Sequence, residues 1–168
     1  MKSTLACLLG STLALASSTS TSSPLHADCT RSDPARFAEQ FFQSHRSFYL
    51  QETPALKPQV TIGLYRALRN HYQCAAAEGV CHLDYDPWLG AQNGEMAGPA
   101  LFQVPRGDAR PVRVSMTYRF MLEPGKPARA RKVVLQLQPA QPPQCWQVDD
   151  LITPRGHSLA RRYSSKTP

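Results

Sequence analysis

The chain has 168 residues and a formal net charge of +7, and 42% of its residues are hydrophobic. This length suits one domain with its own core and excludes an assembly of several domains. Most of the excess positive charge lies from Arg106 onward, and it indicates a basic face on the folded protein.

The N-terminus has the features of a secretory signal peptide. Lys2 supplies a small positive region, and an apolar run over residues 5–16 follows it that is too short to span a bilayer. Small-residue motifs permit cleavage after Ala16 or Ala27, so residues 1–27 are predicted to be a signal peptide with its Ser/Thr-rich cleavage region. The mature protein is therefore expected in the periplasm. We expect no lipid on Cys7, because too few residues precede it to form an export signal.

Four cysteines remain after cleavage: Cys29, Cys74, Cys81 and Cys145. An even number in an exported chain predicts disulfides, and four cysteines allow three connectivities. We favour Cys74–Cys81, which closes a short loop at the end of a helix, together with Cys29–Cys145, which joins the mature N-terminus to the last strand. The alternative to these disulfides is that the four cysteines are free buried thiols. No metal site is predicted, because Cys-x-x-Cys is missing and the histidines are scattered.

Two helices are predicted in the first half of the mature chain. The first begins at Pro34 with Asp33 as its N-cap. Its aromatic face is typical of a core-facing helix and consists of Phe37, Phe41, Phe42, His45, Phe48 and Tyr49. The second begins after Thr61 and ends at Gly79, which suits a left-handed cap. Its core face consists of Leu64, Ala67, Leu68, His71, Tyr72 and Ala75.

Residues 83–95 are irregular and join the helices to the sheet. They include four potential calcium ligands, Asp84, Asp86, Asn93 and Glu95. Their spacing does not follow the calcium-binding loop of about twelve residues, because the glycine and the final glutamate are misplaced. Asp86 before Pro87 instead indicates the start of a turn.

A sheet of three or four antiparallel strands is predicted next. Hydrophobic and polar residues alternate most clearly over residues 111–122, which indicates a long half-buried strand. The other strands are expected at Leu101–Val104, Arg131–Gln138 and Gln144–Ile152. The segment after Pro154 is expected to add one helical turn, with Leu159 packed back and the rest frayed.

The last strand contains a large aromatic residue, Trp146, which is expected to anchor the strand in the core, and a pair of carboxylates. Side chains alternate along a strand, so Trp146, Val148 and Asp150 are expected on the inner face and Asp149 on the outer one. Two helices followed by antiparallel strands predict an α+β fold, in which a curved sheet wraps the helices and forms a cone-like pocket.

This pattern resembles the nuclear transport factor 2-like fold, and more narrowly the bacterial exported family known as domain of unknown function 3828. The resemblance rests on Phe48-Tyr49 in the first helix, Thr61 to Leu68 in the second, residues 83–92 and the strand 146–152. It implies a single domain over residues 28–163, followed by a disordered tail at 164–168. It implies that the protein is exported, but it does not point to any enzymatic reaction. Some small exported domains of this shape resemble immunity proteins, which neutralise antibacterial toxins.

The resemblance also implies an enzymatic alternative. Cones of this fold house dehydratases and isomerases that use a His–Asp pair as a general base. Here Asp150 would pair with His71 or His45. However, the sequence lacks Gly-x-Ser-x-Gly, His-Glu-x-x-His and a glycine-rich phosphate loop. We therefore expect no enzyme activity, no catalytic residues and no cofactor.

The sequence is interpreted instead as a periplasmic binding protein, most specifically an immunity protein that blocks an antibacterial effector. The partner is expected to be a protein, with an acidic surface, and not a nucleic acid. Trp, Tyr and Arg usually anchor tight interfaces, and the expected contact residues are Tyr85, Asp86, Trp88, Arg113, Arg119, Arg131, Lys132 and Asp150. Trp88 has a second interpretation, as a plug in the mouth of the cone.

A third interpretation is an envelope accessory or small-ligand-binding protein that uses the cone as an apolar pocket. A pocket in which Asp150 and a histidine converge would favour an enzyme or a ligand carrier. A filled cone would favour a recognition surface.

Overall fold

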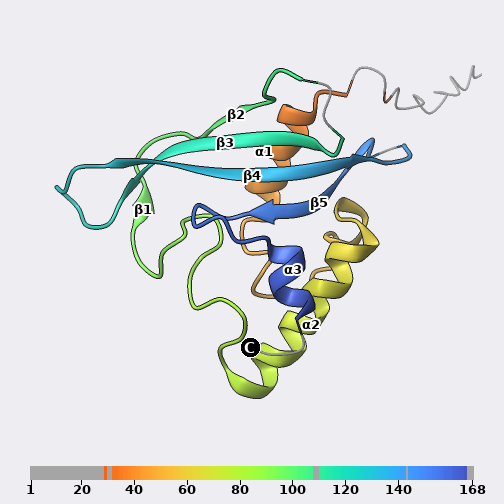
Figure 1. Cartoon of the computed structure of the whole chain (residues 1–168), viewed down its shortest axis with the longest axis horizontal. Helices are drawn as coiled ribbons and strands as arrows, with labels where there is room; N and C mark the ends of the chain where they lie inside the picture. The colour runs from red at the N-terminus through yellow and green to blue at the C-terminus, as the bar shows by residue number, and fades with distance from the viewer. Residues whose placement is uncertain (1–28, 30–31, 108–109, 143, 166–168) are drawn as a thin grey trace, which may run out of the picture.

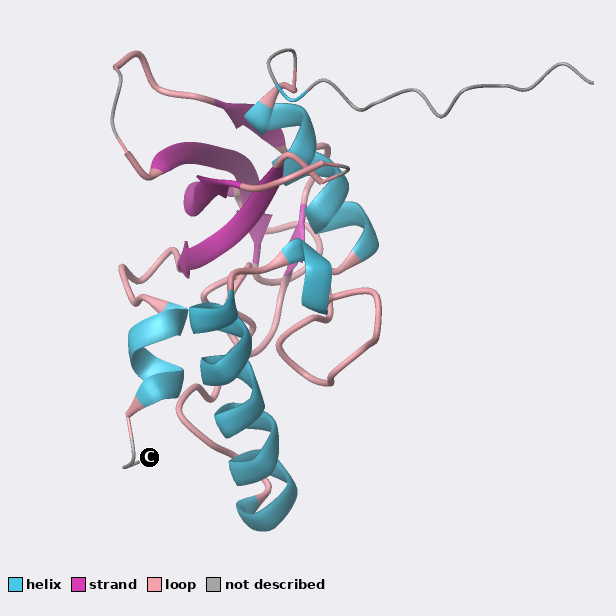
Figure 2. Cartoon of the chain, turned by 90° about the vertical axis from the view of Figure 1, so that its right-hand side faces the viewer, coloured by secondary structure: helices cyan, strands magenta, loops and turns pink. Residues whose placement is uncertain are grey.

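The structure is a computed structural model that describes residues 29, 32–107, 110–142 and 144–165. These residues form an α+β fold, as predicted, with three α-helices and a five-stranded antiparallel sheet. The sheet curls into a half-barrel, and α2 and α3 lie side by side beneath it (Figure 1 and Figure 2). None of the described helices is long and apolar enough to cross a membrane. The predicted signal peptide lies outside the described residues.

Helix α1 covers Pro34–Ser44 and begins as predicted, because the Asp33 side chain accepts a hydrogen bond of 2.9 Å from the Ala35 amide. Ala38 and Phe41 are buried against the sheet. The helix ends before the aromatic pattern does, so Phe48 lies in the turns that follow and still reaches the core.

Helix α2 covers Ile62–Glu78 and confirms both predicted caps. Thr61 Oγ1 accepts a hydrogen bond from the Leu64 amide, and Gly79 adopts a left-handed φ of 81° that ends the helix. Its buried face consists of Leu64, Ala67, Leu68 and His71. The buried face of α2 and the two ends of the helix therefore follow from the sequence alone.

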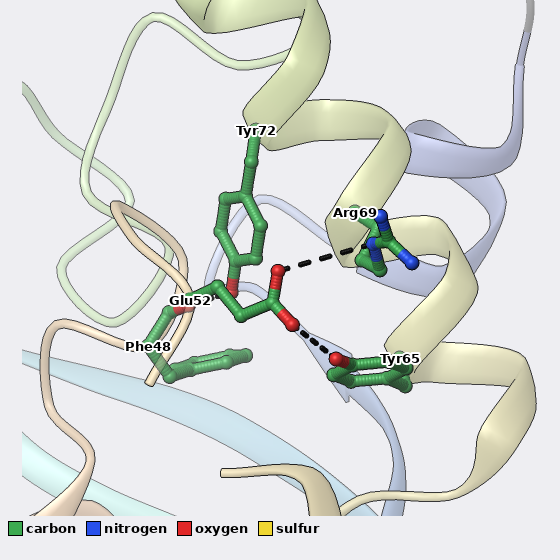
Figure 3. Close-up of polar contacts among 5 residues, drawn as sticks. All are labelled: Phe48, Glu52, Tyr65, Arg69 and Tyr72. Carbon is green, nitrogen blue, oxygen red and sulfur yellow. Dashed lines mark hydrogen bonds and ion pairs between the residues drawn. The ribbon is translucent and has the colours of Figure 1, made fainter. Parts of the chain in front are cut away.

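The segment between α1 and α2 is held against α2 by polar contacts (Figure 3). Glu52 accepts a hydrogen bond from the Tyr65 hydroxyl and pairs with Arg69 at 3.8 Å. The Tyr72 hydroxyl donates to the Phe48 carbonyl. A short 3-10 helix, η2 at Lys57–Gln59, then leads into α2. These contacts fix Phe48 where it can pack into the core.

The sheet consists of β1 (Glu95–Met96), β2 (Leu101–Gln103), β3 (Val112–Met121), β4 (Arg129–Pro139) and β5 (Trp146–Ile152). Strands β1 and β2 both pair with one edge of β3, and β4 and β5 follow on its other side. Four strands agree with the predicted positions. The two-residue β1 was not predicted, since so short a segment has no visible alternation.

Gly94 allows β1 to approach β3. A Cβ at this position would lie 2.5 Å from the Phe120 ring and 2.7 Å from the Met121 carbonyl oxygen. Its φ of 106° is also one that other residues rarely adopt. This glycine therefore anchors the loop 83–95 to the edge of the sheet.

The core fills the space between the inner face of the sheet and the helices. On β3 the buried residues alternate as predicted, and β4 contributes Val133, Leu135 and Leu137. Trp88 from the loop lies among them without any exposed surface. The interior is therefore packed with side chains rather than open.

Strand β5 does not alternate over its full length. Gln136 of β4 pairs with Asp150, and Leu137 pairs with Val148, so Asp149 is an extra residue in a β-bulge. Trp146 and Val148 share the inner face, as predicted. Beyond the bulge Leu151 faces the core, so the prediction that Asp150 faces inward is wrong. A one-residue insertion moves every later side chain to the opposite face.

Helix α3 covers Leu159–Ser164. Leu159 packs back as predicted, but Tyr163 is also fully buried, so the prediction that the segment frays beyond Leu159 is wrong. Both favoured disulfides are present, Cys29–Cys145 and Cys74–Cys81. Two disulfides are compatible with export to an oxidising compartment.

Candidate functional site

Trp88 is part of the core and not an exposed anchor. Its ring lies 5.0 Å from Phe42 and 5.7 Å from Phe48, measured between centroids, in edge-to-face geometry. Its Nε1–H donates to the Arg46 carbonyl oxygen at 2.8 Å. The prediction of Trp88 as an exposed contact residue is therefore wrong, and the residue fills the interior instead.

Its neighbours Tyr85 and Asp86 are also engaged inside the protein. Asp86 Oδ1 accepts hydrogen bonds from the amides of Trp88 (2.7 Å) and Leu89 (3.2 Å), which confirms the predicted turn. The Tyr85 side chain is buried, and its hydroxyl lies 2.5 Å from His157 Nδ1. Neither residue therefore has a side chain free for an interface.

Two arginines hold this loop in place. Arg131 donates to the Leu89 carbonyl and stacks 3.7 Å over the Phe120 ring. Arg155 donates to the Gly90 carbonyl at 2.8 Å and stacks 4.1 Å over the Tyr85 ring. Arg131 was predicted as a contact residue, but it belongs to the inner-facing series of β4 and its guanidinium is used within the fold.

Asp150 lies on the outer face and organises the start of α3. Its carboxylate accepts from Ser158 Oγ (2.5 Å) and from the amides of Leu151 (2.8 Å) and Ala160 (2.9 Å). Ser158 is in turn the N-cap of α3. Asp149, predicted to face solvent, accepts from Thr61 Oγ1 at 2.9 Å and so connects β5 to α2.

Replacing Asp150 with alanine is expected to destabilise the protein by about 2–3 kcal/mol, since two buried donors and one half-buried donor lose their acceptor. Urea denaturation followed by tryptophan fluorescence measures the change. Asp84→Ala is the control, because Asp84 is exposed and its one hydrogen bond joins two exposed side chains, so the expected change is within ~0.5 kcal/mol. Unchanged stability in Asp150→Ala would contradict the assigned role.

The candidate catalytic pair is not assembled. His45 caps α1 and packs against Phe41, with ring centroids 5.2 Å apart. His71 stacks on Tyr163 at 4.1 Å, and burial, with a smaller effect of His82, lowers the pKa of His71 to about 4. Asp150 contacts neither histidine, because its carboxylate is occupied on the outer face.

A hollow of about 750 Å³ does open beside His71, between α2, α3 and the loop 83–95. It contains Asp86 rather than Asp150, and Tyr49 bonds to Asp86 there. Burial, reinforced by this carboxylate, raises the pKa of Tyr49. The Asp86 carboxylate in this hollow is thus already used by Tyr49 and two backbone amides.

The outer face of the sheet has a groove, named here the outer groove, of about 400 Å³. Val134 and Ile152, which pair across β4 and β5, form its apolar floor. Arg113, Lys132 and Arg161 line its sides. Adjoining hollows of about 680 Å³ and 320 Å³ share floor and wall residues with it. The first adds Arg131 and Arg155, and the second adds Asp149 and Asp150.

The positive charge of the outer groove is not neutralised within the described residues. Their only ion pair is Arg69–Glu52, which lies elsewhere. Asp149 and Asp150 are turned toward Thr61 and the start of α3. Arg113 and Lys132 were predicted as contact residues, whereas Arg161 was assigned to a frayed tail. Arg119 is exposed on the same face but lies outside the groove and donates to the Ala128 carbonyl at 3.0 Å.

No protein-family model matches the chain, and no curated protein or solved structure matches it either. The resemblance to domain of unknown function 3828 and to the nuclear transport factor 2-like fold therefore stays a prediction.

Proposed function

We propose that this protein is a non-enzymatic binding protein that recognises an acidic protein through the outer groove. The observation that carries the proposal is the set of three cations, Arg113, Lys132 and Arg161, around an apolar floor, with no carboxylate of the described residues within ion-pair distance. Unpaired cations attract an acidic surface and orient it as it approaches.

The apolar floor favours a protein over other anions. Val134 and Ile152 offer a strip that a hydrophobic side chain can cover, next to cations that can pair with carboxylates. Protein interfaces combine an apolar centre with a polar rim in this way. A nucleic acid backbone would use the cations and gain little from the floor.

The immunity function expected from the family resemblance is a specific form of this proposal. The acidic partner would then be an antibacterial effector, and the protein would act in the periplasm. The half-barrel would be a nuclear transport factor 2-like cone whose packed interior supports the outer groove. The filled core, with Trp88 inside it, supports a recognition surface over a ligand carrier.

The test compares two double charge reversals. Arg113→Glu/Lys132→Glu alters the outer groove, and Arg36→Glu/Arg66→Glu alters exposed arginines on α1 and α2. Both change the net charge equally. We expect the first to weaken binding of poly-L-glutamate, measured by calorimetry, by about tenfold or more, and the second to change it little.

Two results would overturn the proposal. One is equal weakening by both variants, which would mean that net charge alone attracts the polymer. The other is a DNA duplex that binds through Arg113 and Lys132 as tightly as poly-L-glutamate at the same salt concentration. Rescue of cells from a periplasmic effector by the wild type, and not by the groove variant, would support the immunity form.

A further inference from the structure

Three metal-ligating side chains, those of Cys74, Cys81 and His82, meet at the C-terminal end of α2, and a fourth, His71, lies against His82. The sequence there reads His71-x-x-Cys74, and after six further residues Cys81-His82. His71 and Cys74 are three residues apart on the helix and so lie on one face. The chain turns at Gly79, which brings Cys81 back to Cys74.

The two histidines also face each other. His82 has a left-handed backbone with φ of 63°, which is uncommon outside glycine. Its Nδ1 lies 3.4 Å from Nδ1 of His71. Two imidazole nitrogens bound to one tetrahedral Zn²⁺, each about 2.0–2.1 Å from the metal, are separated by about 3.4 Å. The spacing of the two nitrogens therefore already fits a shared zinc ion.

The sulfur atoms lie close to His82. The ligand atoms of Cys74, Cys81 and His82 are all within 4.8 Å of one another. Two thiolates and two imidazoles are a typical ligand set of structural zinc, with Zn–S distances of about 2.3 Å. Sulfur ligands select zinc over calcium and magnesium, which prefer oxygen.

Backbone groups already orient both imidazole rings. His82 Nε2 lies 3.2 Å from the Ser165 carbonyl oxygen, which can only accept, so Nε2 carries the proton and Nδ1 keeps its lone pair. The backbone of Tyr49 hydrogen-bonds the His71 ring. Ligating histidines in metal sites are commonly oriented by such backbone contacts.

We propose that His71, Cys74, Cys81 and His82 form a tetrahedral Zn²⁺ site when the Cys74–Cys81 disulfide is reduced. A dithiol reductant supplies two electrons and two protons to the S–S bond and itself becomes a disulfide. Zn²⁺ then displaces the two thiol protons and binds both thiolates. The disulfide and the metal are thus alternative states of one site, independent of the outer groove.

The test uses the reduced full-length protein and its own cysteines as controls. After reduction with a phosphine, Zn²⁺ is added, the thiols are alkylated with iodoacetamide, and each cysteine is followed by peptide mass spectrometry. We expect zinc to slow alkylation of Cys74 and Cys81 by about tenfold or more, because bound thiolates are not free nucleophiles. Cys29 and Cys145 should react at unchanged rates.

Two variants separate this site from binding by thiols alone. His71→Ala/His82→Ala is expected to abolish the protection, whereas His45→Ala, which alters a histidine outside the cluster, should retain it. Co²⁺ in place of zinc should give the visible absorption of a tetrahedral site only in the reduced protein. Equal protection of Cys74, Cys81, Cys29 and Cys145, protection that survives the double variant, or a tetrahedral Co²⁺ spectrum in the oxidised protein would overturn the proposal.

Discussion

Trp88→Ala is expected to lower the free energy of unfolding by about 3–5 kcal/mol, the usual range for removing a large buried aromatic residue. The variant loses the edge-to-face contacts with Phe42 and Phe48, and it leaves the Arg46 carbonyl without its donor. Urea denaturation followed by circular dichroism measures the loss, since that signal does not depend on the deleted indole.

Trp88→Phe and Leu101→Ala provide the comparison. Phenylalanine keeps most of the ring and should restore part of the stability. Leu101 is 60% exposed, so its truncation should change stability by less than ~0.5 kcal/mol. A Trp88→Ala variant that stays as stable as the wild type but no longer binds acidic protein would contradict this prediction. It would show that Trp88 is a surface contact residue.

Cys145→Ser is expected to destabilise the oxidised protein by about 5 kcal/mol in the chain-entropy model, because Cys29 and Cys145 are 116 residues apart. The same model gives about 2.5 kcal/mol for Cys81→Ser, since the Cys74–Cys81 loop spans only 7 residues. Denaturant midpoints should therefore rank the wild type first, Cys81→Ser second and Cys145→Ser last.

Reduction provides the internal control. With both disulfides opened, the wild type and Cys145→Ser should unfold at nearly the same denaturant concentration. Equal midpoints under oxidising conditions would instead show that the Cys29–Cys145 bridge contributes no stability.

The local rules of helix and strand formation predicted most of the fold. Asp33, Thr61 and Gly79 mark the helix ends because caps act through neighbouring backbone groups, which are readable in sequence. Strand β3 was placed within one residue at each end because its alternation is regular. The bulge at Asp149 was not predicted, since it depends on the register with β4 and leaves no local signal.

The candidate sites were harder to predict, because they depend on contacts between distant residues. Arg113 and Lys132 follow from outward positions on predicted strands, but Arg161 comes from a segment without strong periodicity. In the sequence, Arg131 cannot be distinguished from a surface arginine. Only the structure shows its contact with the Leu89 carbonyl. His71 and His82 seemed scattered, yet the turn after α2 brings them into contact.

The Cys29–Cys145 bridge has a consequence for how this protein would respond to proteases. It closes most of the described chain into one covalent ring. A single backbone cut between these cysteines would leave two fragments that remain joined and packed on each other. They would run together in electrophoresis without reductant and separate only after reduction, so a nicked molecule would keep its shape.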